Sequence, residues 1–199
     1  QMGASVPTIY ASLNGRVMSS LKPERVAAES ILKGPAIKDF DLGTPDDAMA
    51  PLMDATVLSC LTSYAQGMEL LRIASRDLDY SLHMPSIAPL WTGGCIIRAR
   101  LLKRIQDAFG ANPDLTNLML DPWFADQINR RLPGLAKVVA GAAESGIPVP
   151  CFSSTLDYIN SYRTGRLPQN LVQAMRDCFG SHTYQRVDKE GTFHTEWLG

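Results

Sequence analysis

Apolar residues recur at steps of three and four along most of the chain, a spacing that predicts amphipathic helices. The longest such stretch predicts a helix that runs to about residue 78. No alternation typical of a strand extends over a useful length before residue 183. The pattern therefore predicts an all-α fold of roughly eight helices. The apolar face of the longest helix is marked by Met53, Val57, Cys60, Leu61, Tyr64, Met68 and Leu71.

A helix-start signal lies just before that stretch. Thr44 can act as the N-cap, Pro45 suits the first helical position, and Asp47 can reach back as in a capping box. Pro51 is unfavourable inside a helix because it lacks a backbone N–H and its ring collides with the preceding turn. We therefore expect the regular part of this helix to begin only at Pro51.

Glycine and proline residues divide the rest of the chain into shorter segments. Residues 39–47 and 83–94 are predicted to be irregular connections. Two further details concern the later helices: a kink or break is expected at Pro133-Gly134, and Ser154 with Asp157 matches a capping pattern. The remaining helices are expected at residues 8–20, 22–33, 95–109, 122–146, 153–165 and 168–180.

The last residues differ from the helical body. They follow Gly180, where the final helix should end, and they are rich in polar and aromatic side chains. Phe193 and Trp197 need an apolar pocket, either in their own domain or in a partner subunit. We therefore divide the chain into a helical domain, residues 1–180, and a non-helical C-terminal arm, residues 181–199.

The overall composition restricts the possible partners. The chain has 199 residues, of which 45% are hydrophobic and 20% charged, as in an ordinary globular protein. Nineteen basic residues face twenty acidic ones, so no broad basic field attracts nucleic acid or acidic lipid. No run approaches the roughly 18 apolar residues of a membrane span. We expect neither a nucleic-acid partner nor a membrane partner.

The cysteines indicate a reducing compartment. Cys60, Cys95, Cys151 and Cys178 are widely spaced among apolar neighbours, and no C-x-x-C pair occurs. This pattern favours buried, reduced thiols over disulfides or a metal site. The first residues contain no basic segment followed by an apolar run, so they do not match a secretory signal. A cytoplasmic protein is expected.

Several kinds of chemistry have no motif in the sequence. Neither G-x-G-x-x-G nor G-x-x-x-x-G-K-[ST] occurs, which predicts that this chain has no nucleotide-binding fold of its own. No G-x-S-x-G elbow is present. His182 and His194 are twelve residues apart without a completing ligand set, so no metal site is predicted. His83 is expected to be a hydrogen-bonded packing residue.

Two arginines leave two interpretations open. Arg16 lies on a short helix that is otherwise built from small and apolar residues, and Arg176 lies in the last helix. Each could be an ordinary surface or salt-bridged arginine. Alternatively, both could belong to a site where guanidinium groups bind a phosphate or carboxylate bidentately. Composition and spacing do not choose between the two.

Longer motifs resemble a known family. Residues 176–197, RDCFGSHTYQRVDKEGTFHTEW, are similar to the C-terminal signature of the 6-phosphogluconate dehydrogenases, the decarboxylating NADP-dependent enzymes of the pentose phosphate pathway. The resemblance covers essentially the whole chain, in order. It is also carried by residues 15–35, 63–72, 90–102 and 146–180.

The architecture of that family implies what this chain would contribute. Its members have an N-terminal Rossmann domain that binds NADP, followed by a large helical domain that makes most of a homodimer interface. The resemblance places this chain in the later part of the helical domain. The catalytic lysine and glutamate would then lie upstream, so no catalytic residue is expected here and the chain alone should be inactive. Contacts between this chain and the coenzyme stay unassigned.

The resemblance also implies substrate-binding residues. One family arginine that binds the 6-phosphate of 6-phosphogluconate falls on Arg16. A second arginine and a histidine, which the partner subunit supplies, fall on Arg176 and His182. The C-terminal arm would thus reach into the neighbouring subunit. Three other basic residues of the arm match no substrate contact and are expected at the interface: Arg186, Lys189 and His194.

Two functional hypotheses follow. In the family, a hydride passes from C3 to NADP, C1 leaves as carbon dioxide, and protonation of the enediol gives ribulose 5-phosphate. The leading hypothesis is the substrate-binding and dimerising part of such an enzyme. The alternative is a non-catalytic helical dimerisation module that shares the scaffold.

Overall fold

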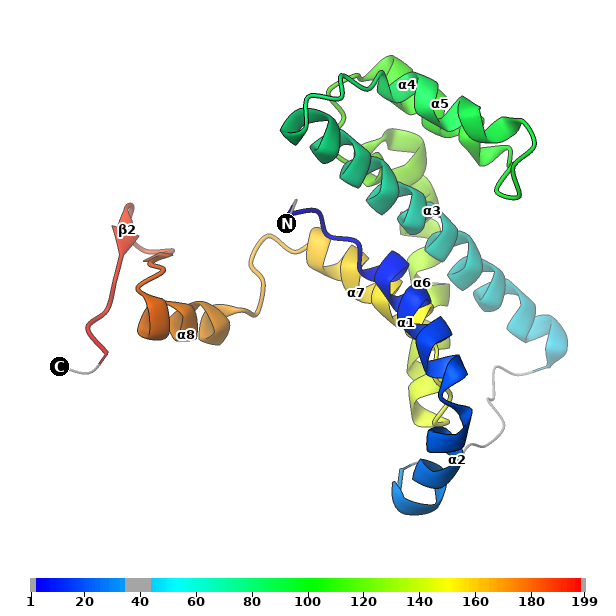
Figure 1. Cartoon of the computed structure of the whole chain (residues 1–199), viewed down its shortest axis with the longest axis horizontal. Coiled ribbons are helices and arrows are strands. Elements are labelled where there is room, and N and C mark those ends of the chain that lie inside the picture. Colours follow the sequence, from blue (N-terminus) through cyan, green and yellow to red (C-terminus); the bar gives the residue numbers. More distant parts are fainter. Residues whose placement is uncertain (1–2, 35–43, 198–199) are drawn as a thin grey trace. The chain divides into compact units, whose positions relative to one another are not determined.

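Helices dominate the computed structural model, which describes residues 3–34 and 44–197. Within these ranges lie eight α-helices, two short 3-10 helices and a pair of two-residue strands (Figure 1). The predicted all-α fold is confirmed. The chain divides into two compact units, the first ending at Ile159 and the second beginning at Asn160. The elements are α1 (Pro7–Ser20), α2 (Lys22–Ile31), α3 (Pro45–Asp77), α4 (Met84–Ile87), η1 (Ala88–Thr92), α5 (Leu101–Ala111), η2 (Leu118–Leu120), α6 (Pro122–Glu144), α7 (Pro150–Tyr162), α8 (Asn170–Gly180), β1 (Tyr184–Gln185) and β2 (Thr192–Phe193).

The start of α3 has the capping box that the sequence predicted. The Thr44 hydroxyl accepts a hydrogen bond from the Asp47 backbone N–H at 3.3 Å, and Asp47 Oδ2 accepts one from the Thr44 backbone N–H at 3.0 Å. The helix begins at Pro45, so the expectation that it becomes regular only at Pro51 is wrong. The cap and the packing of the following turns outweigh the one backbone hydrogen bond that Pro51 cannot donate.

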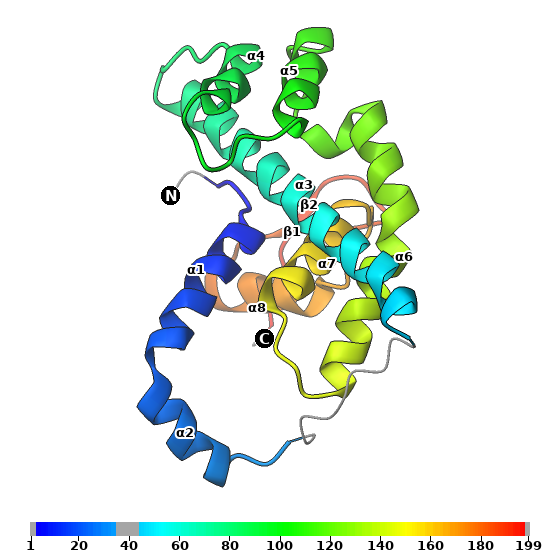
Figure 2. The same cartoon turned by 90° about the vertical axis from the view of Figure 1, so that its right-hand side faces the viewer.

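The core of the first unit lies where α3 packs against α6 (Figures 1 and 2). The predicted apolar face of α3 is only partly right. Leu61 and Met68 are buried, whereas Met53 and Cys60 are exposed. Small residues occupy part of the buried face and let the two helices approach closely. The residues that α3 buries are Ala55, Leu58, Leu61, Thr62, Ala65, Gln66, Met68, Ile73 and Ala74.

Gly134 lies at a close approach between α3 and α6. A Cβ atom at this position would lie 2.5 Å from Asp54 Oδ2 and 2.8 Å from Asp54 Cβ. Asp54 Oδ1 also accepts a hydrogen bond from Arg131 Nη1 at 3.1 Å, one turn earlier on α6. The sequence predicted a kink or a break at Pro133-Gly134. The break does not occur, because α6 continues as one helix from Pro122 to Glu144, and the kink stays a prediction. The glycine makes room for α3 and does not end the helix.

Several predicted boundaries shift. Helix α5 begins at Leu101, and turns occupy much of residues 95–100. Residues 83–94 contain α4 and η1. Pro150 opens α7, so Ser154 lies inside the helix and its hydroxyl donates to the Cys151 carbonyl at 3.1 Å instead of capping. Most of the predicted connection 39–47 lies outside the described residues.

Two expectations about burial are wrong. Cys60 is exposed, and the other three cysteines are only partly buried. His83 Nδ1 lies 2.6 Å from Ser86 Oγ, which confirms its hydrogen bond, but the side chain is exposed and does not pack in the core. In the described parts of the chain, no helix combines the length and the apolar character needed to cross a membrane.

The close approach at Gly134 gives a first prediction. Gly134→Ala is expected to lower the free energy of unfolding by about 1–3 kcal/mol, the usual cost of overpacking, because the new methyl group displaces Asp54. Gly67→Ala is the matched control, since no atom lies within 4 Å of the Cβ atom that it adds on α3. This control should raise the free energy of unfolding by about 0.5–1 kcal/mol through helix propensity. Urea unfolding measures the free energy of unfolding of both variants. If it changes equally in the two, the role assigned to Gly134 is contradicted.

Candidate functional site

Arg176 and His182, two of the three residues that the sequence proposed for substrate binding, line one cavity in the second unit. The cavity has a volume of about 340 Å³, and its lining comes from α8 and the residues just after it. Arg176 Nη1 donates a hydrogen bond to Gln173 Oε1 at 3.2 Å. The guanidinium is exposed and makes no salt bridge among the described residues. The cavity is lined by Val172, Met175, Arg176, Phe179, Gly180 and His182.

A strained turn after α8 places His182. Ser181 caps the helix in the left-handed conformation, with φ of 49°, and its N–H donates to the Asp177 carbonyl at 2.9 Å. Thr183 also has a positive φ, 58°. Such angles are uncommon outside glycine. His182 therefore lies between two residues whose backbone needs support from the surrounding structure.

The His182 ring folds back against the end of α8. A Cβ atom at Gly180 would lie 2.8 Å from His182 Cδ2 and 2.9 Å from His182 Nε2. Any larger residue at position 180 would push the ring away. Gly180 thus has a second purpose besides ending the helix: it lets the imidazole lie close to the backbone beside Arg176.

The Asp177 carboxylate is the centre of the second unit. This residue is 0% exposed and lies on α8 next to Arg176 in the sequence. Four donors surround it. Oδ1 accepts from the Thr183 N–H and from His194 Nδ1, both at 2.9 Å. Oδ2 accepts from the backbone N–H of residue 195 at 3.0 Å and from Trp197 Nε1 at 2.9 Å.

These contacts keep Asp177 ionised. Burial raises the pKa of Asp177, but the hydrogen bonds from His194, Thr195 and Trp197 together lower it further than burial raises it. The pKa of this carboxyl therefore lies well below its ordinary value of 3.8. Because the carboxylate is ionised at neutral pH, it can only accept hydrogen bonds, and His194 Nδ1 must carry the proton that they share.

A small hairpin completes the second unit. Strands β1 and β2 pair antiparallel, with Tyr184 opposite Phe193. The Tyr184 hydroxyl lies 2.6 Å from Thr195 Oγ1. The positive groups of Arg186 and Lys189 lie 5.7 and 5.6 Å from the centre of the Phe193 ring. The arm beyond residue 180 thus folds on α8 within its own compact unit, which is one of the two possibilities that the sequence left open for Phe193 and Trp197.

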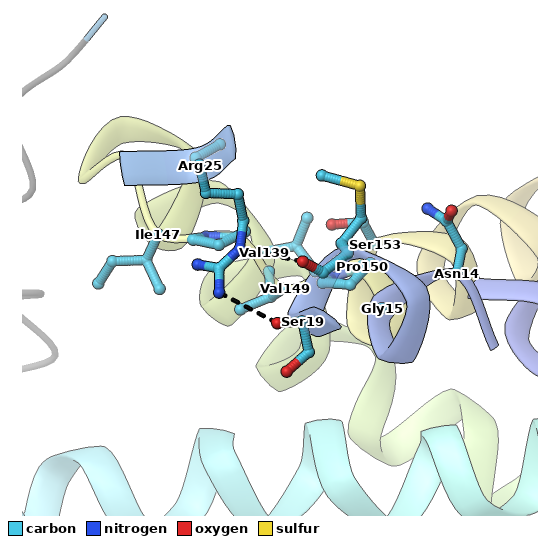
Figure 3. Close-up of a pocket in the computed structure, with 12 residues that line it drawn as sticks. Asn14, Gly15, Ser19, Arg25, Val139, Ile147, Val149, Pro150 and Ser153 are labelled. Atoms are coloured by element: carbon cyan, nitrogen blue, oxygen red, sulfur yellow. Dashed lines mark hydrogen bonds between the residues drawn. The ribbon is translucent and has the colours of Figure 1, made fainter. Parts of the chain in front are cut away.

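Arg16 belongs to the first unit. It lies on α1, its side chain is exposed, and it is not part of the lining of the two cavities described below for this unit. The residues around it line a cavity of about 660 Å³ between α1, α2 and the α6–α7 connection (Figure 3). There, Arg25 Nε donates to the Met18 carbonyl at 3.0 Å and Arg25 Nη2 donates to the Ser19 carbonyl at 3.3 Å. Arg25 thereby bonds two carbonyl groups at the end of α1, of which the Met18 carbonyl also accepts from the Leu21 N–H at 3.3 Å.

Two of the thiols line another cavity of the first unit. It has a volume of about 710 Å³, and its lining includes Cys60, Cys151 and Tyr64. Burial raises the pKa of the Tyr64 hydroxyl, and its neighbours Cys60 and Cys95 raise it further. Among the residues that the structure describes, no three His, Cys, Asp or Glu side chains come together as metal ligands.

Comparisons with known proteins agree with the sequence motifs. The profile of the family described as "6-phosphogluconate dehydrogenase, C-terminal domain" matches residues 1–197. The decarboxylating 6-phosphogluconate dehydrogenase of Synechococcus elongatus is 49% identical over 198 residues, which is 100% of this chain and 42% of that protein. The corresponding enzyme of Synechocystis sp. is 51% identical over 200 residues, 100% of this chain and 41% of that protein.

A solved structure of the family has a similar fold. The 6-phosphogluconate dehydrogenase of Plasmodium falciparum matches with a TM-score of 0.88 and 42% identity, over 98% of this chain and 42% of that one. That enzyme is described in its apo form, with its cofactor NADP+ and with its substrate 6-phosphogluconate. The chain thus spans about two fifths of the length of the relatives it matches.

The carboxylate of Asp177 predicts how the arm responds to acid. Because its pKa is lower in the folded arm than the ordinary 3.8, the ionised group stabilises the arm fully above about pH 5. This stabilisation is lost as the pH falls through 3.8 towards the lower pKa of the folded state. We expect the hydrogen-exchange protection factors of the Thr183 and Thr195 amides to be constant from pH 7 to about 5 and to fall below about pH 4.

Two variants check this assignment at pH 7. Asp177→Asn should lower both protection factors by about tenfold or more, because the amide cannot accept all four hydrogen bonds. Asp188→Asn is the matched control: its carboxylate is exposed and bonds Arg186. It should leave both protection factors unchanged. Unchanged protection in Asp177→Asn would contradict the central role of this carboxylate.

The contact between Gly180 and His182 gives a separate prediction. Gly180→Ala should displace the imidazole, because the new methyl group would lie 2.8 Å from its Cδ2 atom. Gly165→Ala adds the same group where no atom lies within 4 Å. In proton–carbon NMR spectra, the ring Cδ2–H resonance of His182 should move in the first variant only. A resonance that stays in place in Gly180→Ala would show that the ring does not lie against the helix end.

Proposed function

This chain belongs to the 6-phosphogluconate dehydrogenase family as its C-terminal domain, and we propose that it is the substrate-binding and dimerising part of a decarboxylating enzyme of this family. The complete enzyme would oxidise 6-phosphogluconate with NADP and release ribulose 5-phosphate and carbon dioxide. The observation that supports a role in substrate binding is the cavity that Arg176 and His182 share.

We infer that this cavity binds the 6-phosphate of the substrate. Arg176 gives one guanidinium N–H to Gln173, so its remaining N–H groups can form a bidentate pair with a phosphate. His182 adds a second donor beside it. Arg16 is the proposed third contact. In the family pattern it comes from one subunit, while the other two residues come from the partner.

The proposed contribution of these residues is positioning. A phosphate held by two guanidinium groups and an imidazole fixes the distance between the sugar carbons and the reacting groups, which makes the reaction effectively unimolecular. NADP would supply the acceptor for the hydride from C3. The described residues contain no strand–helix nucleotide fold, and in the complete enzyme the N-terminal Rossmann domain would bind most of the NADP. The general acid and base would also lie outside this chain.

Exposed apolar side chains support the dimerising role. On α8, Leu171, Met175 and Phe179 recur at steps of four, and they are 73%, 49% and 84% exposed. On α1, Ile9, Leu13 and Val17 recur at the same spacing and are 40–58% exposed. Apolar stripes of this kind are typical of surfaces that another subunit or domain covers. The proposal therefore includes a homodimer in which the arm, residues 181–199, contacts the partner.

We also propose that the protein is cytoplasmic. All four cysteines are free thiols, and one of them, Cys60, is exposed. Free thiols are characteristic of reducing compartments.

The test of the phosphate role uses the complete enzyme that carries this domain, with NADPH formation from 6-phosphogluconate as the assay. Arg176→Ala and His182→Ala are each expected to raise KM for 6-phosphogluconate by about 10- to 100-fold, because each removes a charge-assisted hydrogen bond worth roughly 1.5–3 kcal/mol. KM for NADP should stay within about twofold, since neither side chain is proposed to touch the coenzyme.

The matched control is Arg163→Ala. Arg163 is an exposed arginine of the same unit that bonds Asn160 and does not line the cavity. Its removal should leave KM unchanged. Sedimentation of each variant reports whether the dimer persists. An unchanged KM in both Arg176→Ala and His182→Ala would refute the phosphate role, and no NADPH formation by the unaltered enzyme would refute the proposed activity.

A further inference from the structure

Asp177, the acidic residue next to Arg176, cannot contact a substrate directly. Asp177 is completely buried, and protein donors occupy both of its oxygens, two on each. A carboxylate has about four lone-pair positions, so none is left for a ligand. Any effect of Asp177 on the cavity must therefore act through the groups that it holds.

The same four donors keep the neighbouring arginine available. Asp177 and Arg176 carry opposite charges at adjacent positions, yet no salt bridge joins them among the described residues. Because the carboxylate already accepts four hydrogen bonds inside the unit, it has no lone pair left for the guanidinium. The charge of Arg176 stays on the side of α8 that lines the cavity. A less completely bonded carboxylate would compete with an anion for that guanidinium.

The turn that carries His182 depends on Asp177 at both ends. The Ser181 N–H donates to the Asp177 backbone carbonyl, and the Thr183 N–H donates to its Oδ1 atom, each at 2.9 Å. These two residues flank His182 and both have positive φ angles. A third anchor comes from Gln173 Nε2, which donates to the Thr183 carbonyl. Without its hydrogen bond to the carboxylate, Thr183 would lose an interaction that offsets the energetic cost of its left-handed conformation.

The carboxylate also joins this turn to the end of the arm. His194, Thr195 and Trp197 donate to Asp177 from beyond the hairpin, across 17 to 20 residues of sequence. A single side chain thus closes the loop that starts at α8 and returns past β2. From this arrangement we infer that Asp177 is a positioning residue of the phosphate site, which holds His182 in place and leaves Arg176 free to bind. The inference rests on the proposed function of Arg176 and His182.

The decisive variant is Asp177→Asn in the complete enzyme. Asparagine has the same shape but offers one acceptor oxygen, and its NH2 group would face two of the four donors. We expect KM for 6-phosphogluconate to rise by about tenfold or more, while KM for NADP and kcat change by less than about threefold. Asp188→Asn is the control, because it removes an exposed carboxylate from the same arm, and it should leave KM for 6-phosphogluconate within about twofold.

A double-variant cycle separates positioning from general structural damage. If Asp177 acts by holding His182, then Asp177→Asn should have little further effect once the imidazole is gone. KM of Asp177→Asn/His182→Ala should then lie within about threefold of KM of His182→Ala alone. If the fold increase in KM of the double variant equals the product of the increases in the two single variants, the inference is overturned. An unchanged KM in Asp177→Asn would also overturn it.

The two proposals fail in different ways. If His182→Ala and Arg176→Ala leave KM unchanged, the phosphate role itself is wrong. If these variants raise KM while Asp177→Asn does not, the phosphate role stands and only the positioning inference is wrong.

A milder variant covers the case in which Asp177→Asn does not fold. Trp197→Phe removes one of the four donors and keeps an aromatic ring. It should raise KM for 6-phosphogluconate by about two- to fivefold, because the carboxylate would hold the turn less firmly and would have a free lone pair that competes for Arg176. Trp123→Phe, on α6 in the first unit, is the matched control and should not change KM. An unaltered KM in folded Trp197→Phe would overturn the inference.

Discussion

The second compact unit depends on one buried carboxylate. From Asn160 onward, the described residues include no buried apolar side chain, and Asp177 is the one buried residue among them. A unit this small cannot rely on a hydrophobic core of its own. Its order comes instead from four hydrogen bonds that converge on a charge taken out of water. A buried charge with every lone pair occupied specifies one arrangement sharply, because each partner that is lost leaves part of the charge unsatisfied.

The first unit, in contrast, is held together by a hydrophobic core. Its core is apolar and continuous through α3, α5, α6 and α7, and few polar groups interrupt it. One of these groups, Gln66 on α3, is completely buried. Its Oε1 accepts from the Thr8 N–H and its Nε2 donates to Thr8 Oγ1, both at 3.1 Å. This pair fixes the first turn of α1 against the core, and Arg16 follows two turns later. A buried polar contact thus fixes the start of the helix that carries one proposed phosphate ligand.

The sequence predicted local features well and tertiary features poorly. The capping box at Thr44 and the helix end at Gly180 were both predicted, because each depends on residues within one turn. The late helix start predicted at Pro51 and the break considered at Pro133 fail for one reason. Local rules treat proline as a helix breaker, but packing against the core keeps both helices continuous. Gly134 looked like a second break signal, although it is required by the approach of Asp54.

The candidate site was visible in the sequence only through motif resemblance. Spacing alone could not place Arg176 and His182 on one cavity, because their proximity depends on two left-handed residues and on the glycine before them. Asp177 was missed for a related reason. An acidic residue beside an arginine suggests a surface ion pair, and its true partners lie 6 to 20 residues further along the chain. The available signal was the polar and aromatic composition of the tail, whose donors required an acceptor.

The contrast between the two units bears on how assembly and substrate binding are coupled in the proposed enzyme. A unit held by hydrogen bonds around one charge leaves its apolar side chains, such as Leu171 and Phe179, facing outward. Those side chains can be buried only against another surface, and the proposed dimer provides one. Phe179 also lines the cavity of the proposed ligands Arg176 and His182, near the C-terminal end of α8. In the proposed dimer, the surface that covers the stripe would therefore also border the phosphate site, which would be complete only when the subunits meet.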